Sequence, residues 1–286
     1  MIFKALSLAP RKKVPFLLRS ISMQLIEIFS AIEEIAPLRA AASWDVSGLQ
    51  VAAHRADADV LAVCLDPTPA SVRQALASGA QCILSHHPLA LKPALPRRLD
   101  AYHEVLRLLF AADVPLYSAH TSLDVNANGP AGWLADELAL RNLAVLEPTA
   151  SPLIDAALPL GFGLAGDLPT PLSLTQIVSA LGRHIELSTA TVCGPSPKNI
   201  SRLAYCTGSG SSLLREARAS GAQLFITGDV KYHTALEAEI CLLDVGHHSL
   251  EEEMMRRMSQ VLAQRLAGLN IVFVPSASPL RPALLS

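Results

Sequence analysis

The sequence contains an internal repeat, which restricts the possible folds more than any other feature. Residues 61–87, LAVCLDPTPASVRQALASGAQCILSHH, align without gaps to residues 203–229, LAYCTGSGSSLLREARASGAQLFITGD, at a shift of 142 residues. Ten of the twenty-seven aligned positions are identical, and the run ASGAQ lies in the middle of both copies. Each copy predicts a strand, a turn, a helix closed by a glycine (Gly79 or Gly221) and a second strand.

The similarity continues beyond these segments. Each copy next has a Tyr-His pair at the start of a predicted helix, then a short apolar strand, and then a related phrase: AHTSLD at 119–124 and GHHSLE at 246–251. Four landmarks in the same order favour duplication over a chance likeness of two strand–helix–strand units. We therefore predict an α/β fold of two pseudo-symmetric halves with mixed, largely parallel sheets flanked by helices. The predicted division is an extension at 1–22, a first half at 23–145 and a second half at 150–286.

Composition excludes several classes of protein. A chain of 286 residues with 51% hydrophobic residues can bury a core in each of two domains. The net charge of -2 argues against a dedicated nucleic-acid binder, and no apolar run reaches the roughly 18 residues of a membrane span. Five cysteines without a CxxC pair predict buried free thiols in the reducing cytoplasm. Residues 1–22 hold five basic residues and no acidic one, and we expect a flexible extension rather than a targeting peptide.

Metal-ligand side chains follow three of the predicted strands. They are His86 and His87 in CILSHHPL, His120 and Asp124 in VPLYSAHTSLD, and His247 and Glu251 in LLDVGHHSLE. Ligands of open α/β sheets gather beyond the carboxyl ends of strands, which is where all six lie. Any one of these histidines alone is more often an ordinary surface or core residue. Their convergence from two repeat copies is what predicts a shared site.

The spacing distinguishes among neighbouring candidates. In a helix from residue 247, His247 and Glu251 lie one turn apart on the same face, whereas His248 points about 100° away and can pair with Glu252. His86 and His87 cannot both face one ion in an extended chain, but at a strand end they can face two. A mixed set of imidazoles and carboxylates suits Zn, Mn, Fe or Co. Five or more such ligands exceed one tetrahedral site and suit two divalent ions bridged by a carboxylate.

With these motifs the chain resembles the Nif-three-like family, the type 2 homologues of GTP cyclohydrolase I. The resemblance extends from about Met23 to the end, and its motifs are WDVSGLQV, CLDPTP, LSHHPL, AHTSLD, TGDVKYH and GHHSLE. It implies two α/β halves, a toroidal homohexamer, and two divalent metal ions in a cleft between the halves. The ligands it implies are His86, His87, Asp124, His247 and Glu251, with Glu251 shared and His120 as a candidate proton carrier. Val46 and Ser122 stand where the family often has Asn, which puts substrate contacts in doubt rather than metal binding.

Other residues have weaker support. Candidates for contact with a substrate or for support of the ligands are Trp44, Asp45, Asp66, Asp229, Lys231 and His233. At the second-copy position of His86 and His87 stand Gly228 and Asp229, so we expect only one metal centre to survive. The cations of the Pro-rich loop at 88–100 could receive a phosphate, but a solvated loop is the favoured interpretation. Residues 251–266 predict an amphipathic helix with its charges outward, and His248, Glu252 and Glu253 are interpreted as helix-surface residues.

Two functions compete. The first is a dinuclear metal-dependent hydrolase of a nucleotide-like or phosphorylated small molecule, with GTP cyclohydrolase-like ring opening as one version. In it His120 moves protons, because imidazoles titrate near neutral pH. The second is a non-catalytic metal-binding regulator, chaperone or scaffold. An open coordination position would favour the first and a closed one the second.

Overall fold

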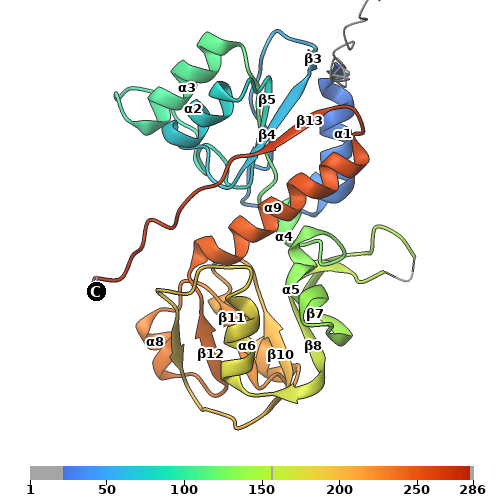
Figure 1. Cartoon of the computed structure of the whole chain (residues 1–286), viewed down its shortest axis with the longest axis vertical. Coiled ribbons are helices and arrows are strands. Elements are labelled where there is room, and N and C mark those ends of the chain that lie inside the picture. The colour runs from blue at the N-terminus through green and yellow to red at the C-terminus, as the bar shows by residue number, and fades with distance from the viewer. Residues whose placement is uncertain (1–21, 156, 284–286) are drawn as a thin grey trace, which may run out of the picture.

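The computed structural model describes residues 22–155 and 157–283. Except for Ser22, the predicted N-terminal extension lies outside these residues. Two lobes are stacked along the long axis of the molecule, and one long helix, α9 (His247–Arg265), runs from one lobe into the other (Figure 1). No helix among the described residues is long and apolar enough to cross a membrane.

The first lobe is a sheet in the strand order β13-β4-β5-β6-β2. Its strands are β2 (Gly48–Val51), β4 (Val60–Cys64), β5 (Cys82–Ser85), β6 (Leu116–Ser118) and β13 (Asn270–Phe273). Its helices are α1 (Leu25–Ile35), α2 (Pro69–Ala77) and α3 (Ala101–Ala112). All pairs are parallel except β2 with β6. A small ribbon of β1 (Met23–Gln24) and β3 (Asp57–Ala58) precedes it.

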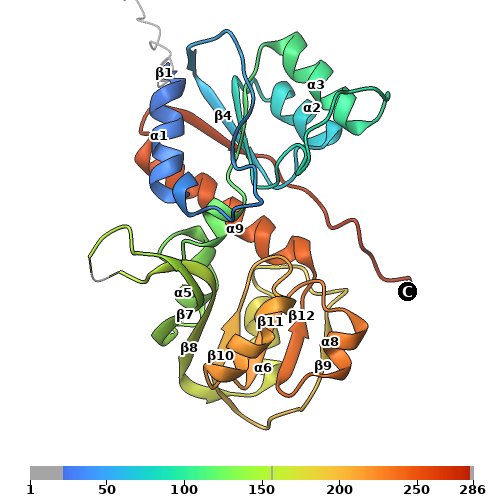
Figure 2. The same cartoon turned by 180° about the vertical axis from the view of Figure 1, so that it is seen from behind.

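Helices cover both faces of this sheet, with α2 and α3 on one face and α1 and α9 on the other (Figures 1 and 2). Strand β4 shows the cause, since successive side chains point to opposite faces. Leu61 and Val63 join the apolar cluster that holds α1 and α9, while Ala62 and Cys64 join the cluster under α2 and α3. Burial on both faces explains why the strand is continuously apolar instead of alternating.

The second lobe is a sheet in the order β7-β8-β10-β11-β12-β9. Its strands are β7 (Arg141–Ala150), β8 (Leu160–Leu172), β9 (Thr191–Cys193), β10 (Ile200–Tyr205), β11 (Leu224–Thr227) and β12 (Cys241–Asp244). Its helices are α6 (Leu174–Leu181), α7 (Leu214–Ala219) and α8 (Tyr232–Leu236). Only β10, β11 and β12 are parallel to each other, so this sheet is less parallel than predicted.

The repeated segments have the same local order in both lobes. The run β4-α2-β5-α3-β6 of the first corresponds to β10-α7-β11-α8-β12 of the second, each with three parallel strands. The helix-closing glycines have left-handed backbones, with φ of 83° at Gly79 and 82° at Gly221, as the sequence predicted. The lobes do not follow the predicted division throughout: β7 begins at Arg141 in the second sheet, and β13 returns to the first.

Helix α9 differs from its prediction. Instead of an outer helix it is central to the molecule, and Met254, Met255 and Met258 are fully buried in the cluster that reaches both sheets. The short helices α4 (Thr121–Asp124) and α5 (Trp133–Glu137) lie beside it between the lobes, and α5 meets its middle, where Arg257 bonds Glu137. Helix α9 connects β12 of one lobe to β13 of the other, and its first turns lie against His86 and His87, which follow β5 at the carboxyl end of the first sheet.

Candidate metal centre

Four histidines meet where the lobes adjoin, and each is held by its Nδ1 atom. The Nδ1 atoms of His86, His87, His120 and His247 lie 2.7–2.8 Å from the oxygens of Ala119 (backbone), Asp66, Asp45 and Asp229, respectively. A backbone carbonyl or a carboxylate accepts the Nδ1–H proton and leaves Nε2 free to ligate. This arrangement, in which an oxygen behind the imidazole fixes its orientation, is typical of histidines that bind metal ions.

The Nε2 atoms of three of these rings, those of His86, His87 and His247, converge on Glu251, whose side chain is only 4% exposed. Its Oε1 lies 3.6 Å from Nε2 of His86, whereas its Oε2 lies 3.2 Å from Nε2 of His87 and 3.1 Å from Nε2 of His247. The two oxygens of one carboxylate therefore face two different sets of nitrogens. Helix α9 explains the position, because His247 and Glu251 lie one turn apart on it.

Asp124 completes the deeper side of the cluster. Its Oδ2 lies 3.7 Å from Nε2 of His86, and its Oδ1 accepts a hydrogen bond of 2.9 Å from Thr207. Thr207 follows β10 of the other lobe, so this bond also ties the two halves together. The carboxylate and the imidazole of His86 face the same interior point.

The ligand atoms form three groups that could each hold a metal ion. Within each group they lie within 4.8 Å of one another; the groups are His86-His87-His120, His87-His247-Glu251 and His86-Asp124-Glu251. The second and third groups share Glu251. Within the described part of the chain, Nε2 of His86 and Oε2 of Glu251 are buried without a hydrogen-bond partner. Unpaired buried polar atoms are costly, and a bound cation would satisfy both, so the residues fit a metal site.

Electrostatics also favours a cation here. Burial works to raise the pKa of Glu251, but the surrounding imidazoles, His86 foremost, outweigh it and hold that pKa well below its usual range. Burial works to lower the pKa of His87, but the hydrogen bond with Asp66 and the nearby carboxylate of Glu251 raise it to about 10. The carboxylate of Glu251, 3.1 Å away, and then that of Asp229 raise the pKa of His247 to about 9. The cluster thus stabilises positive charge at its centre, as a site for a divalent cation must.

Two glycines provide the room for this cluster, and the sequence analysis did not identify their role. A Cβ atom on Gly208 would lie 2.1 Å from Oε1 of Glu251, and one on Gly228 would lie 2.5 Å from the backbone nitrogen of His247. Gly208 also has φ of +57°, in the left-handed region. In the repeat alignment, Gly208 is the counterpart of Asp66 and Gly228 that of His86. The replacement of Asp66 and His86 by glycine in the second copy is the sequence feature that could have pointed to these two positions.

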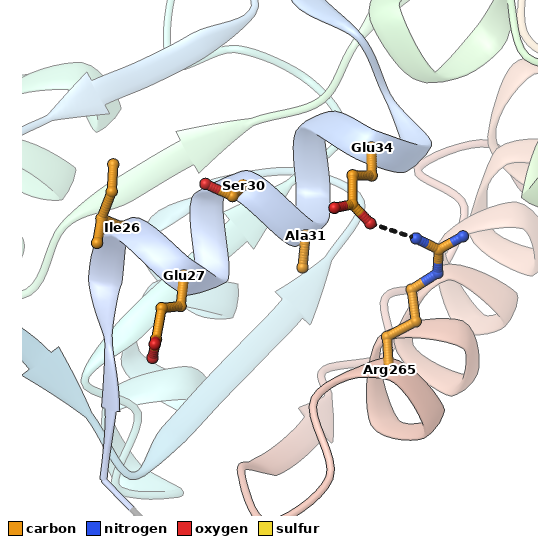
Figure 3. Close-up of a pocket in the computed structure, with 6 residues that line it drawn as sticks. All are labelled: Ile26, Glu27, Ser30, Ala31, Glu34 and Arg265. Atoms are coloured by element: carbon orange, nitrogen blue, oxygen red, sulfur yellow. Dashed lines mark hydrogen bonds and ion pairs between the residues drawn. The ribbon is translucent and has the colours of Figure 1, made fainter. Parts of the chain in front are cut away.

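A pocket of about 480 Å³ lies along α1, away from the histidine cluster, and its lining differs in chemistry from the cluster. It is lined by aliphatic and acidic side chains together with Arg265 of α9, which pairs with Glu34 at 2.8 Å (Figure 3). Ile26 on its rim is 70% exposed, although it is a large apolar residue. No imidazole lines this pocket, so it does not compete with the histidine cluster as a metal site.

Comparison with known proteins places these residues in a family. The model of Duf34/NIF3 (NGG1p interacting factor 3) matches residues 23–279. The chain belongs to the Duf34/NIF3 family. A NIF3-family relative from Nostoc sp., the GTP cyclohydrolase 1 type 2 homolog, is 32% identical over 219 residues, covering 74% of this chain and 79% of that protein. NIF3-like protein 1 of Drosophila melanogaster is 30% identical over 260 residues, covering 88% and 86%.

Solved structures of other proteins share the fold. Reduced HcgD from Methanocaldococcus jannaschii superposes with a TM-score of 0.76 at 25% identity, covering 89% of this chain and 98% of that one. A Bacillus cereus protein related to NIF3 gives a TM-score of 0.79 at 22% identity, covering 93% and 99%. The family resemblance proposed from the motifs is thereby confirmed.

In this NIF3-family chain most of the predicted site residues lie together. His86, His87, His120, Asp124, His247 and Glu251 form the cluster, and Asp45, Asp66 and Asp229 hold three of its imidazoles. Asp229 therefore serves the same centre as the first half and is not the remnant of a second one. Trp44 lies beside His120, with 5.8 Å between ring centroids. Lys231 and His233 are exposed at the start of α8, and no hydrogen bond or ion pair joins either one to the cluster within the described residues.

The surface interpretation of the remaining charged residues of α9 is wrong. The side chain of Glu253 is only 4% exposed and accepts hydrogen bonds from Arg256 and Arg257. Glu252 is 15% exposed and accepts from the backbone and hydroxyl of Ser276. His248 lies 3.8 Å from Glu252, the pairing expected from their spacing. Ser276, which lies beyond the end of β13, contacts His248 and Glu252 of α9, and sequence periodicity does not reveal this contact.

Proposed function

We propose that this chain is a hydrolase that uses two divalent metal ions, of the Zn, Mn, Fe or Co type, in a cleft between its halves. The observation that carries the proposal is the orientation of Glu251, since its two oxygens face different imidazoles. In this assignment His86 and Asp124 would hold one ion, His87 and His247 would hold the other, and both groups would share Glu251. Two bound ions would supply a water of lowered pKa and would stabilise negative charge on a substrate.

His120 is proposed to move a proton. Its Nδ1 is held by Asp45 at 2.8 Å, while its Nε2 faces the cluster. Burial works to raise the pKa of Asp45, but hydrogen bonds, with His120 foremost, hold it well below its usual range. The ionised Asp45 fixes the orientation and the tautomer of the ring, which is the role of the carboxylate behind a general base.

The substrate class is proposed from the family. Several relatives carry the name GTP cyclohydrolase 1 type 2 homolog, which supports a nucleotide-like or phosphorylated small molecule and, as a specific version, ring-opening hydrolysis of GTP. The matching order of the repeats supports the inference that the two halves arose by duplication.

We also propose a toroidal hexamer on the basis of the family resemblance, and sedimentation analysis of the purified chain tests it.

The experiment is a turnover screen of the Mn-, Zn-, Fe- and Co-loaded protein against GTP, other nucleotides and phosphoesters. The Glu251→Ala variant is the blank. We expect metal-dependent turnover that Glu251→Ala abolishes. His120→Gln should keep its metal content and lose about 100-fold or more in kcat, because proton transfer contributes about that much. Metal loss in His120→Gln would make His120 a ligand, and full metal content without any turnover would favour the non-catalytic metal-binding protein.

A further inference from the structure

Trp44 is a large aromatic side chain left open to solvent beside the metal centre. Its side chain is 61% exposed, whereas Trp133, the other tryptophan, is 1% exposed. Its ring centroid lies 5.8 Å from that of His120, and the ring planes meet at 72°. In an edge-to-face pair of this kind, at least one face of the indole stays free of its partner.

The loop that carries Trp44 is anchored to the site. The next residue, Asp45, accepts hydrogen bonds of 2.7 Å from the backbone of Val46, 2.6 Å from Ser47 Oγ and 2.8 Å from His120 Nδ1. It also accepts from the backbone and hydroxyl of Thr121, and that hydroxyl in turn accepts from the backbone nitrogen of Ala42. These bonds fix residues 42–47 to the segment after His120, so the indole is held in a defined place beside the ligands.

We propose that Trp44 is the residue that recognises a planar heteroaromatic ring in the substrate, by stacking the ring on its free face. This assignment rests on the proposed hydrolase function and adds the class of substrate, a ring compound whose reacting or charged group meets the metal centre. A rigid indole loses little conformational freedom on binding and offers a face to any flat ring. The anchoring by Asp45 ties the position of the indole to that of His120, so the ring is positioned with respect to the proposed proton carrier.

The test adds two probes to the metal-loaded full chain, guanosine 5′-monophosphate and ribose 5-phosphate. Both contain ribose and phosphate, but only the first has a heteroaromatic base. We expect guanosine 5′-monophosphate to quench tryptophan fluorescence in the wild type but not in Trp44→Ala. Trp44→Ala should raise its Kd about tenfold or more, as for loss of one stacked base. Trp44→Phe should restore most of the affinity, and the Kd of ribose 5-phosphate should stay the same in all three proteins.

Metal content and oligomeric state are measured in the same samples. A wild type without bound metal contradicts the proposed function and is recognised before any ligand is added. An unchanged Kd for guanosine 5′-monophosphate in Trp44→Ala, or no binding of it to a fully metal-loaded wild type, overturns the role of Trp44. So does a parallel loss of both probes, or a changed oligomeric state, because either shows that the indole serves the structure of the loop or a contact between copies.

Discussion

The two halves of the molecule begin from the same sequence pattern and contribute differently to one site. After β5, the first half places two imidazoles, His86 and His87. After β11, at the matching positions, the second half has Gly228 and Asp229. Gly228 leaves room for the start of α9, and Asp229 holds His247 from behind. At matching positions the first copy thus supplies imidazoles, whereas the second supplies space and a carboxylate that supports His247, so two similar units contribute unequally to one cluster.

Glu251→Ala should have the largest effect on this arrangement. Its carboxylate is the contact shared by both ligand sets, so its removal should cost at least one of two bound metal equivalents, measured by elemental analysis after loading and desalting. Glu252→Gln is the matched control, because Glu252 lies next to it on α9 but binds Ser276. Unchanged stoichiometry in Glu251→Ala would show that each half holds its metal alone.

Gly208→Ala tests the space that the second half provides. The added Cβ would meet Oε1 of Glu251 at 2.1 Å, and the residue would remain at φ of +57°. We expect Glu251 to be displaced and metal content to fall toward that of Glu251→Ala, while circular dichroism stays close to the wild type.

Gly182→Ala is the control for the added methyl group. The nearest atom to its Cβ would be Val178 O at 3.4 Å, an ordinary contact, so metal content should not change. Normal metal binding by Gly208→Ala would mean that the cluster tolerates a shifted Glu251 carboxylate. The close approach of Gly208 to Glu251 would then not be required for metal binding.

Asp66→Asn and Asp229→Asn compare the supports of the two halves directly. Each aspartate holds the Nδ1 of a proposed ligand at 2.7 Å, His87 in one case and His247 in the other. Loss of the negative charge makes Nε2 of the histidine a less basic metal ligand, and we expect each variant to bind metal about 10–100-fold more weakly. Competition with a chromophoric chelator measures it.

Equal losses in the two variants would show that the second copy has regained, through a different position, the support that the first copy has. The exposed Asp57, in β3 of the first lobe, provides the control as Asp57→Asn. A loss in Asp66→Asn alone would make His87 the stronger ligand and would leave Asp229 as a loop residue.

Much of this arrangement was predictable because it depends on local patterns. Helical spacing selected His247 and Glu251, and the repeat identified the strand ends that carry the clustered imidazoles and carboxylates. Three features were not predictable, since they depend on tertiary packing. The return of β13 to the first sheet makes α9 central, and its charged residues then become buried. The role of Gly208 depends on an approach of β10 to α9 that no local pattern reports. Ile26 has the apolar character of a core residue, yet its helix turns it to solvent.

Glu251 and Glu253 offer the last comparison, because they lie two residues apart on α9 and both side chains are 4% exposed. Imidazoles surround the first. Guanidinium groups surround the second, with bonds of 2.6 Å from Arg256 and 2.8 Å from Arg257, and Arg257 also bonds Glu137 and lies over the ring of Trp133. We therefore expect Glu253→Gln to leave metal content unchanged and to lower the free energy of unfolding by about 2 kcal/mol at pH 7, by urea denaturation.

The pH dependence distinguishes this ion-pair network from simple packing. Burial works to raise the pKa of Glu253, but the bonds from Arg256 and Arg257 outweigh it and hold the pKa below its usual value of 4.5. A carboxylate with a lowered pKa in the folded state contributes its stability above the unfolded-state pKa and loses it as the pH falls through the folded-state pKa. The difference between wild type and Glu253→Gln should therefore be constant near neutral pH and shrink below about pH 4.5. If the difference in the free energy of unfolding persists in acid, Glu253 stabilises the fold through its packing and not through its ion pairs with Arg256 and Arg257.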